Sequence, residues 1–176
     1  MTMKNKEFSE KFGIPHSKVR RYAKDFLSPD LVATLHSGKA REHSVNEAFT
    51  IYLAEHLIAN MGFKTDEAKN IIQALEPWLK LKGFYPELEP GVVPDEEPTS
   101  IHIIRAGTTS GFFYKSVKLI LNKPLEQDKI HKYERHYIEE DIMERPKYLS
   151  GLNNYVLNIS MLLEDFNSRN KGIMQF

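Results

Sequence analysis

Apolar residues in the first half of the chain recur every three or four positions, the spacing of helices with one buried face. Four helices are predicted on this basis. The first contains Phe8 and Phe12, the second Val19, Tyr22, Ala23 and Phe26, the third runs from about Val45 to Met61, and the fourth opens at Thr65. Because proline removes a backbone donor, we expect Pro77 to disturb the fourth helix.

The third predicted helix has clear signals at both ends. Ser44-Val45-Asn46-Glu47 fits the S-x-x-E capping box, in which the Ser44 hydroxyl and the Glu47 carboxylate each accept a backbone N–H. Gly62 follows the last apolar residue and can adopt the left-handed conformation that often ends a helix. The limits of this helix are therefore well specified.

A proline-rich, acidic segment interrupts the helical pattern. FYPELEPGVVPDEEPTS, residues 84–100, has a proline every fourth residue from Pro86 to Pro98, five acids and no Lys or Arg. This composition favours extended, solvated backbone. We predict a linker at 84–100 between domains at 1–83 and 101–176.

Beyond the linker the apolar period changes to two. GFFYKSVKLILN predicts a strand, and Ile101 to Ala106 is its expected hairpin partner through Gly107 to Gly111. Because two strands alone are marginally stable, helices are expected near Asp128 to Glu144 and Leu152 to Asn167 to pack on them. The second of these helices would carry an apolar stripe for a core or a partner chain, made of Leu152, Tyr155, Val156, Ile159, Leu162, Leu163 and Phe166.

The predicted fold class is α+β, with a mainly helical N-terminal domain and a small C-terminal domain of a β-hairpin and two helices. Lys plus Arg and Asp plus Glu number 24 each, so only a local patch could attract a charged partner. The chain has no cysteine, which excludes disulfides and thiolate metal sites. No stretch suits a signal peptide or a membrane span, and we expect a soluble, cytoplasmic protein without a membrane partner.

Positive charge is concentrated near the N-terminus. Residues 3–43 hold nine Lys and Arg against five acids, about +4 in a neutral chain. Two short helices joined by Gly13-Ile14-Pro15 form a helix-turn-helix candidate, whose second helix would enter the major groove of DNA. His16, Ser17 and Lys18 are the expected base contacts. Lys18, Arg20, Arg21, Lys39 and Arg41 are the expected phosphate contacts, the last two from a hairpin wing with Gly38 near its tip.

Residues 4–75 resemble the DNA-binding domain of the MerR family, bacterial transcription regulators with a winged helix-turn-helix. Five short motifs in order carry the resemblance: Glu7-Phe8-Ser9, Gly13-Ile14, Val19-Arg20-Arg21-Tyr22, Arg41-Glu42-His43-Ser44, and Met61-Gly62-Phe63 followed by Thr65-Asp66-Glu67-Ala68. The resemblance implies double-stranded DNA as the partner. It also implies that Arg20, Tyr22 and Arg41 clamp phosphates, with His43 at the position of the family's wing tyrosine.

The chain departs from this family in its wing and beyond the fourth helix. Gly38-Lys39-Ala40-Arg41 replaces the usual Gly-Tyr-Arg of the wing, and Arg21 replaces an aromatic residue. Pro77, Gly83 and Pro86 leave no room for the long helix through which the family dimerises. We therefore expect a homodimer formed through another surface, with Leu152 to Phe166 the first choice.

Other chemistry is weakly supported by the sequence. His131, Glu134, His136, Glu139 and Glu140 could be taken for a metal or acid–base cluster, but the two histidines are five residues apart, roughly 140° out of alignment on a helix, and do not share a face. A solvated polar helix face is the favoured interpretation. No catalytic residue, metal site or cofactor is predicted, and an enzyme is not expected. Whether a small-molecule effector exists is left open.

The favoured function is that of a sequence-specific DNA-binding transcription regulator. One alternative is an architectural DNA-binding protein of the excisionase type, which shares the winged-helix plan. A second is an adaptor whose N-terminal helices bind another protein, since amphipathic helices with basic solvated faces are common outside DNA-binding proteins.

Overall fold

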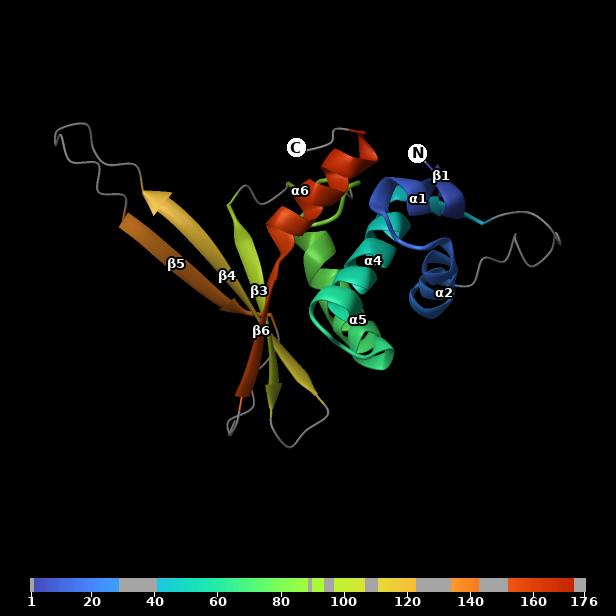
Figure 1. The fold of residues 1–176 in the computed structure, drawn as a ribbon. Coiled ribbons are helices and arrows are strands. Elements are labelled where there is room, and N and C mark those ends of the chain that lie inside the picture. The colour runs from blue at the N-terminus through green and yellow to red at the C-terminus, as the bar shows by residue number, and fades with distance from the viewer. Residues whose placement is uncertain are drawn as a thin grey trace. The chain divides into compact units, whose positions relative to one another are not determined.

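The computed structural model describes residues 2–28, 41–88, 90–93, 97–106, 111–122, 134–142 and 152–172. The chain divides into two compact units, the first made of Met1–Pro94 with Leu162–Phe176, and the second of Asp95–Met161 (Figure 1). The elements, in order, are β1 Thr2–Lys4, α1 Asn5–Phe12, α2 His16–Phe26, β2 Glu42–Ser44, α4 Val45–Glu55, the π-helix η1 His56–Asn60, α5 Thr65–Leu81, β3 Thr99–Ala106, β4 Phe112–Asn122, β5 Glu134–Asp141, β6 Leu152–Asn158 and α6 Ile159–Asn170. This is a mixed α+β structure, as predicted.

The first two helices form as the apolar spacing indicates. α1 buries Phe8 and Phe12 and stops at Gly13, whose φ of 68° is left-handed and whose N–H donates to the Ser9 carbonyl at 3.0 Å. Pro15 then precedes α2, which buries Val19, Tyr22 and Ala23. The short connection at Gly13 to Pro15 therefore sets α2 directly beside α1.

A two-stranded antiparallel sheet joins the start of the chain to the entrance of α4. Thr2, Met3 and Lys4 of β1 pair with Ser44, His43 and Glu42 of β2. Met3 and His43 are both buried at the centre of this pairing. The predicted wing tip at Gly38 and Lys39 lies outside the described residues.

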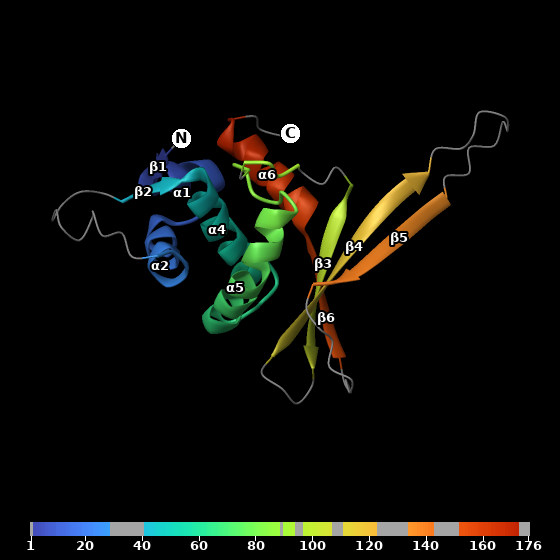
Figure 2. The same ribbon diagram turned by 180° about the vertical axis from the view of Figure 1, so that it is seen from behind.

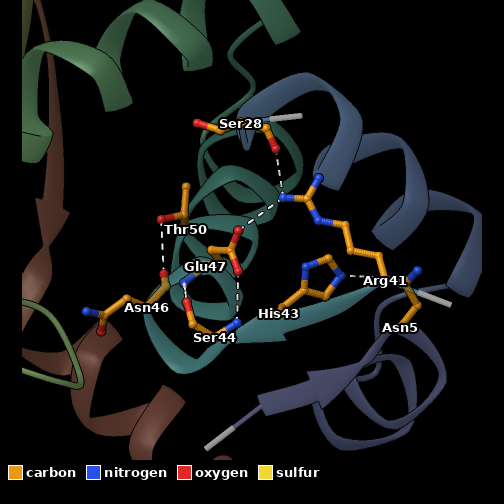
Figure 3. Close-up of polar contacts among 8 residues, drawn as sticks. All are labelled: Asn5, Ser28, Arg41, His43, Ser44, Asn46, Glu47 and Thr50. Carbon is orange, nitrogen blue, oxygen red and sulfur yellow. Dashed lines mark hydrogen bonds and ion pairs between the residues drawn. The ribbon is translucent and has the colours of Figure 1, made fainter. Parts of the chain in front are cut away.

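The capping box predicted for the third helix is confirmed. The Ser44 hydroxyl accepts the Glu47 N–H at 3.2 Å, and the Glu47 carboxylate accepts the Ser44 N–H at 2.9 Å (Figure 3). α4 continues into η1, after which Gly62 turns the chain with a φ of 77°. The predicted span to Met61 is thus right in extent, while the wider π-turn at its end was not foreseen.

The fourth helix is longer than the sequence suggests. α5 passes through Pro77 and ends at Leu81, burying Leu75 and Leu79 on either side of the proline. Pro77 itself is exposed, so its ring faces solvent and the buried face of the helix is preserved. The disturbance expected at Pro77 therefore does not end the helix, which continues to Leu81.

The start of the predicted linker belongs to the first unit. Phe84 and Tyr85 are each 3 % exposed, Phe84 stacks on Trp78 and Tyr85 lies edge-on to Phe49. At the other end, Thr99 and Ser100 already belong to β3. Large aromatic side chains bury too much apolar surface to remain in a solvated linker, even beside prolines.

The second unit is built on one antiparallel sheet of four strands in the order β5-β4-β3-β6 (Figure 2). The predicted hairpin is confirmed, with Ile101 opposite Ser116 and Ile103 opposite Tyr114. The helix expected at 128–144 is wrong for residues 134–141, which form β5. The helix expected at 152–167 is right only in its second half, because β6 occupies residues 152–158 and α6 begins at Ile159. Backbone pairing with β4 and with β3 supplies the hydrogen bonds that a helix would otherwise make internally.

The apolar stripe expected to mediate dimerisation is consequently split between two elements. Tyr155 and Val156 lie on β6, while Ile159, Leu162 and Phe166 lie on α6 and are buried within the chain itself. Leu152 begins β6, and Leu163 on α6 is partly exposed. The stripe is therefore not one free helical face.

Phe166 explains why the C-terminal residues group with the first unit. Its ring stacks on Phe12 at 4.8 Å between centroids and lies 5.3 Å from Phe49 and 5.7 Å from Tyr52. Tyr52 also donates a hydrogen bond to Asp165. The predicted domain at 101–176 thus gives its last residues to the N-terminal core.

Candidate nucleic-acid interface

α2 has one buried and one exposed face, and the exposed face is basic. Val19, Tyr22 and Ala23 hold the helix in the core. The exposed side chains recur at helical spacing along the opposite face, and they are His16, Ser17, Arg20, Arg21 and Lys24. The charges that the sequence places in this region are therefore presented together to solvent.

Two of these cations have no partner in the described part of the chain. Arg20 and Lys24 make no ion pair or hydrogen bond there, whereas on α1 Lys11 pairs with Glu7 at 3.1 Å and Lys6 with Glu10 at 4.0 Å. The Arg21 guanidinium lies 5.1 Å from the centre of the Tyr22 ring. The exposed face of α2 thus keeps charges available for an anionic partner.

Lys18 and Tyr22 turn inward to a carboxylate on α4. The Lys18 ammonium and the Tyr22 hydroxyl donate to the two oxygens of Glu55 at 3.1 and 2.7 Å. Burial, followed by the hydrogen bond to Glu55, raises the pKa of Tyr22. These two side chains anchor α2 to α4, so Tyr22 does not stand where a phosphate could reach it, and Lys18 is engaged.

Arg41 is part of the fold at the entrance of α4. Its guanidinium donates to the Ser28 carbonyl at 2.8 Å and to the Glu47 carboxylate at 3.0 Å, and its side chain is only 17 % exposed (Figure 3). Glu47 is also the second partner of the capping box. Arg41 therefore ties the end of α2 to the first turn of α4.

His43 is fully buried in β2. Its Nε2 lies 2.6 Å from the Asn5 side-chain oxygen at the start of α1 (Figure 3). This position suits a residue that joins the small sheet to α1. Of the nine predicted DNA-binding residues, the structure brings His16, Ser17, Arg20 and Arg21 together on one exposed surface.

Lys24 completes this surface, although the sequence analysis did not select it as a contact. It stands four residues after Arg20 and eight after His16, so all three lie along one face of the helix. That spacing was visible in the sequence. We call the set His16, Ser17, Arg20, Arg21 and Lys24 the basic face of α2.

A second polar group joins α4, η1 and α6. Burial and the hydrogen bond to Asp165 raise the pKa of Tyr52 to about 12. Burial raises the pKa of Asp165, but the hydrogen bonds from Tyr52 and Arg169 outweigh this effect and leave it lowered. Burial lowers the pKa of His56, against a smaller opposing effect of Asp165. This group makes α6 part of the N-terminal core.

A cleft of about 310 Å³ lies between the end of α2 and the first turn of α4. Its walls include Phe26, Asn46 and Lys80, and Thr50 and Tyr85 lie within 3.4 Å of each other in it. The Asn46 side-chain amide donates a hydrogen bond to the Glu87 carbonyl and accepts one from the Glu87 N–H, each at 2.9 Å. The polar groups of the cleft thus serve the fold.

Metal sites and membrane-spanning helices have requirements against which the described part of the chain can be compared. The described residues include no cluster of three or more His, Asp or Glu side chains placed to bind a metal ion. Among the helices of the described ranges, none combines the length and the apolar character needed to span a bilayer. In comparisons with known proteins, no protein family and no curated protein matches this chain.

Proposed function

We propose that the protein is a sequence-specific DNA-binding transcription regulator whose N-terminal unit acts as a winged helix-turn-helix. The observation that carries this proposal is the basic face of α2. It is exposed because the opposite face of the same helix is buried in the core. Regulators of this kind insert such a helix into the major groove, where the groove width accommodates it.

The order of elements supports the same proposal. α1 and α2 are joined by three residues, Gly13 to Pro15. After α2 the chain forms β2, which pairs with β1 from the start of the chain and leads directly into α4. A winged helix-turn-helix uses the first helix to support the second and places further phosphate contacts beside it. The partly buried hydrogen bonds from Lys18 and Tyr22 to Glu55 attach α2 to α4 and suit such a role.

The basic face divides into two parts by its chemistry. His16 and Ser17 occupy the first turn of α2, where recognition helices approach base edges. Arg20, Arg21 and Lys24 follow along the same side and suit phosphate oxygens, which accept hydrogen bonds from guanidinium and ammonium groups. Arg41, Tyr22 and His43 stabilise the unit and are not proposed as contacts.

A salt series with random duplex DNA tests the proposal. Fluorescence anisotropy should show binding that weakens steeply with salt, since each phosphate contact contributes about 0.9 to the slope of log K against log salt. Arg20→Ala together with Lys24→Ala should reduce this slope by about two. Lys69→Ala, which removes an exposed cation from α5, is the matched control and should leave the slope unchanged.

The same measurement separates the alternatives. Absence of binding at low salt would overturn DNA binding and leave the basic face of α2 as a surface for a protein partner. Binding with an unchanged slope in the double variant would place the DNA on another surface. An architectural role needs a separate readout: energy transfer between the two ends of the duplex should then show strong bending without preference among sequences.

A further inference from the structure

The two edges of the four-stranded sheet differ sharply in charge. β5 forms one edge and carries Glu134, Arg135, Glu139, Glu140 and Asp141 within its eight residues. β6 forms the other edge, and its seven residues, LNNYVLN, include no charged side chain and no proline. Only one edge therefore has the protection that usually prevents strand-to-strand association.

An unprotected edge is available for backbone pairing. Exposed strand edges present unpaired N–H and C=O groups, and proteins usually guard them with charges, proline or bulges. Among the described residues β6 pairs only with β3, from Ser100 opposite Asn158 to Ala106 opposite Leu152. Asn153 and Asn154 are exposed, and Val156 is 55 % exposed.

We propose that β6 is a homodimer interface, at which it pairs antiparallel with β6 of a second copy about a twofold axis. The two four-stranded sheets then join into one continuous sheet through main-chain hydrogen bonds. This proposal is independent of DNA binding, because it concerns residues of the second unit alone.

The strand suits pairing with itself. Because β6 is uncharged, no like charges meet when two copies align, whereas two copies of β5 would bring several carboxylates together. A twofold axis perpendicular to the sheet places each β6 residue opposite a residue of the second copy whose side chain lies on the same face. With Tyr155 at the axis, Asn153 would lie opposite Leu157, and Asn154 opposite Val156.

Neighbouring residues of β6 point to opposite faces of the sheet. Leu157 is buried on the face that also carries Ile101, its partner on β3, while Val156 points to the open face with its partner His102. Joining two copies with faces matched places Leu157 of each copy opposite the exposed Asn153 of the other, on the face that carries Ile101. Sliding one strand by a single residue would place side chains of opposite faces across from each other, which the twofold axis does not allow. The two strands can therefore shift only in steps of two residues.

Sedimentation velocity of the full chain over a concentration series tests the interface. The natural protein should dimerise, and Val156→Lys should raise the dimer dissociation constant roughly tenfold or more by placing a charge on the edge. Ile138→Lys is the matched control, because Ile138 is 51 % exposed on the opposite edge strand. It should leave the dissociation constant unchanged.

A cross-linking experiment gives a second, independent readout. The chain has no cysteine, so single cysteines can be placed at Asn154, Tyr155 or Val156 on β6 and at Ile138 on β5. Oxidation should give disulfide-linked dimers most readily for Tyr155→Cys, since bridging needs Cβ atoms about 4 Å apart. Circular dichroism of each variant confirms that it is folded.

Three outcomes would overturn the proposal. The first is a natural protein that remains monomeric at the highest concentration studied. The second is a dimer that Ile138→Lys weakens as much as Val156→Lys does. The third is preferential cross-linking at Ile138→Cys. None of these results depends on DNA, so the interface and the regulatory function can fail separately.

Discussion

Arg41 shows how a charged residue in a basic region can belong to the fold. It belongs to the basic region of residues 3–43, yet its guanidinium donates hydrogen bonds to the Ser28 carbonyl and to the Glu47 carboxylate. Glu47 also completes the capping box of α4, so one carboxylate serves two structural purposes. Because this ion pair is partly buried, its hydrogen bonds contribute more to stability than those of a solvated ion pair.

We therefore expect Arg41→Ala to lower stability while leaving the salt dependence of DNA binding intact. Loss of hydrogen bonds to a charged group should reduce the free energy of unfolding by about 1–3 kcal/mol, measured by urea denaturation. The salt slope should stay within error of the natural protein. A reduced slope with unchanged stability would return Arg41 to the phosphate contacts.

His56 should give the N-terminal unit a pH-dependent stability. Burial lowers its pKa in the folded state below the ordinary value of 6.5, so the unfolded chain binds more protons as the pH falls below that value. The stability associated with the uncharged, buried His56 ring is fully present above pH 6.5 and is lost as the pH falls below that value. Asp165, whose pKa is lowered from 3.8, does not titrate in this window.

Urea denaturation of the natural protein and of His56→Gln at about pH 7.5 and about pH 5.5 measures this effect. The natural protein should lose more stability on acidification than the variant, because glutamine cannot be protonated. Equal losses in the two proteins would show that the pKa of His56 is not lowered by folding.

At the level of elements, α6 stabilises the N-terminal unit through one aromatic side chain. Phe166 is completely buried against Phe12, Phe49 and Tyr52. Phe166→Ala should cost about 3–5 kcal/mol in the free energy of unfolding, through lost burial and the cavity left behind. Met161→Ala removes an exposed side chain from the same helix and should change stability by less than about 0.5 kcal/mol.

A purely dimer-forming role for Phe166 predicts a different result. The loss of stability in Phe166→Ala would then vanish under conditions where the natural protein is monomeric. Denaturation at two widely separated concentrations distinguishes these cases.

The elements that the sequence predicts correctly are those whose signals are local. Each of these signals involves residues that are close in sequence. They are the capping box at Ser44 and Glu47, the left-handed glycines, and the apolar alternation in β4. β6 was misread because Leu152, Tyr155, Val156 and Ile159 also fit a helical spacing. Pairing with β3 decides its state, and short apolar runs carry no local sign of such distant partners.

The candidate site was predicted in part for the same reason. The amphipathic pattern of α2 is local, so its exposed residues His16, Ser17, Arg20 and Arg21 were found. Lys18 and Tyr22 bind Glu55, which is more than 30 residues away in sequence. Arg41 binds Glu47, which lies on another element. Charge alone does not tell whether a cation faces solvent or completes a buried hydrogen bond.

On the scale of the whole molecule, the N-terminal unit is discontinuous in sequence. Its last segment, from Leu162 onward, returns after the sheet of the second unit, and Lys11 of α1 donates to the Asn170 carbonyl at 3.3 Å. Sequence composition suggests a boundary near the prolines, but a cut there removes the ring of Phe166 and the carboxylate of Asp165 from the core.

A fragment of residues 1–94 should therefore lack a cooperative thermal transition, since the sites that Phe166 and Asp165 fill would be open to water. Adding residues 159–172 as a fused segment behind a flexible Gly/Ser linker of roughly 20 residues should restore the transition. The same fusion carrying Phe166→Ala is the control and should fail to restore it. Circular dichroism melts of the three proteins make the comparison, and a cooperative transition in the unfused fragment would show that the N-terminal core closes without α6.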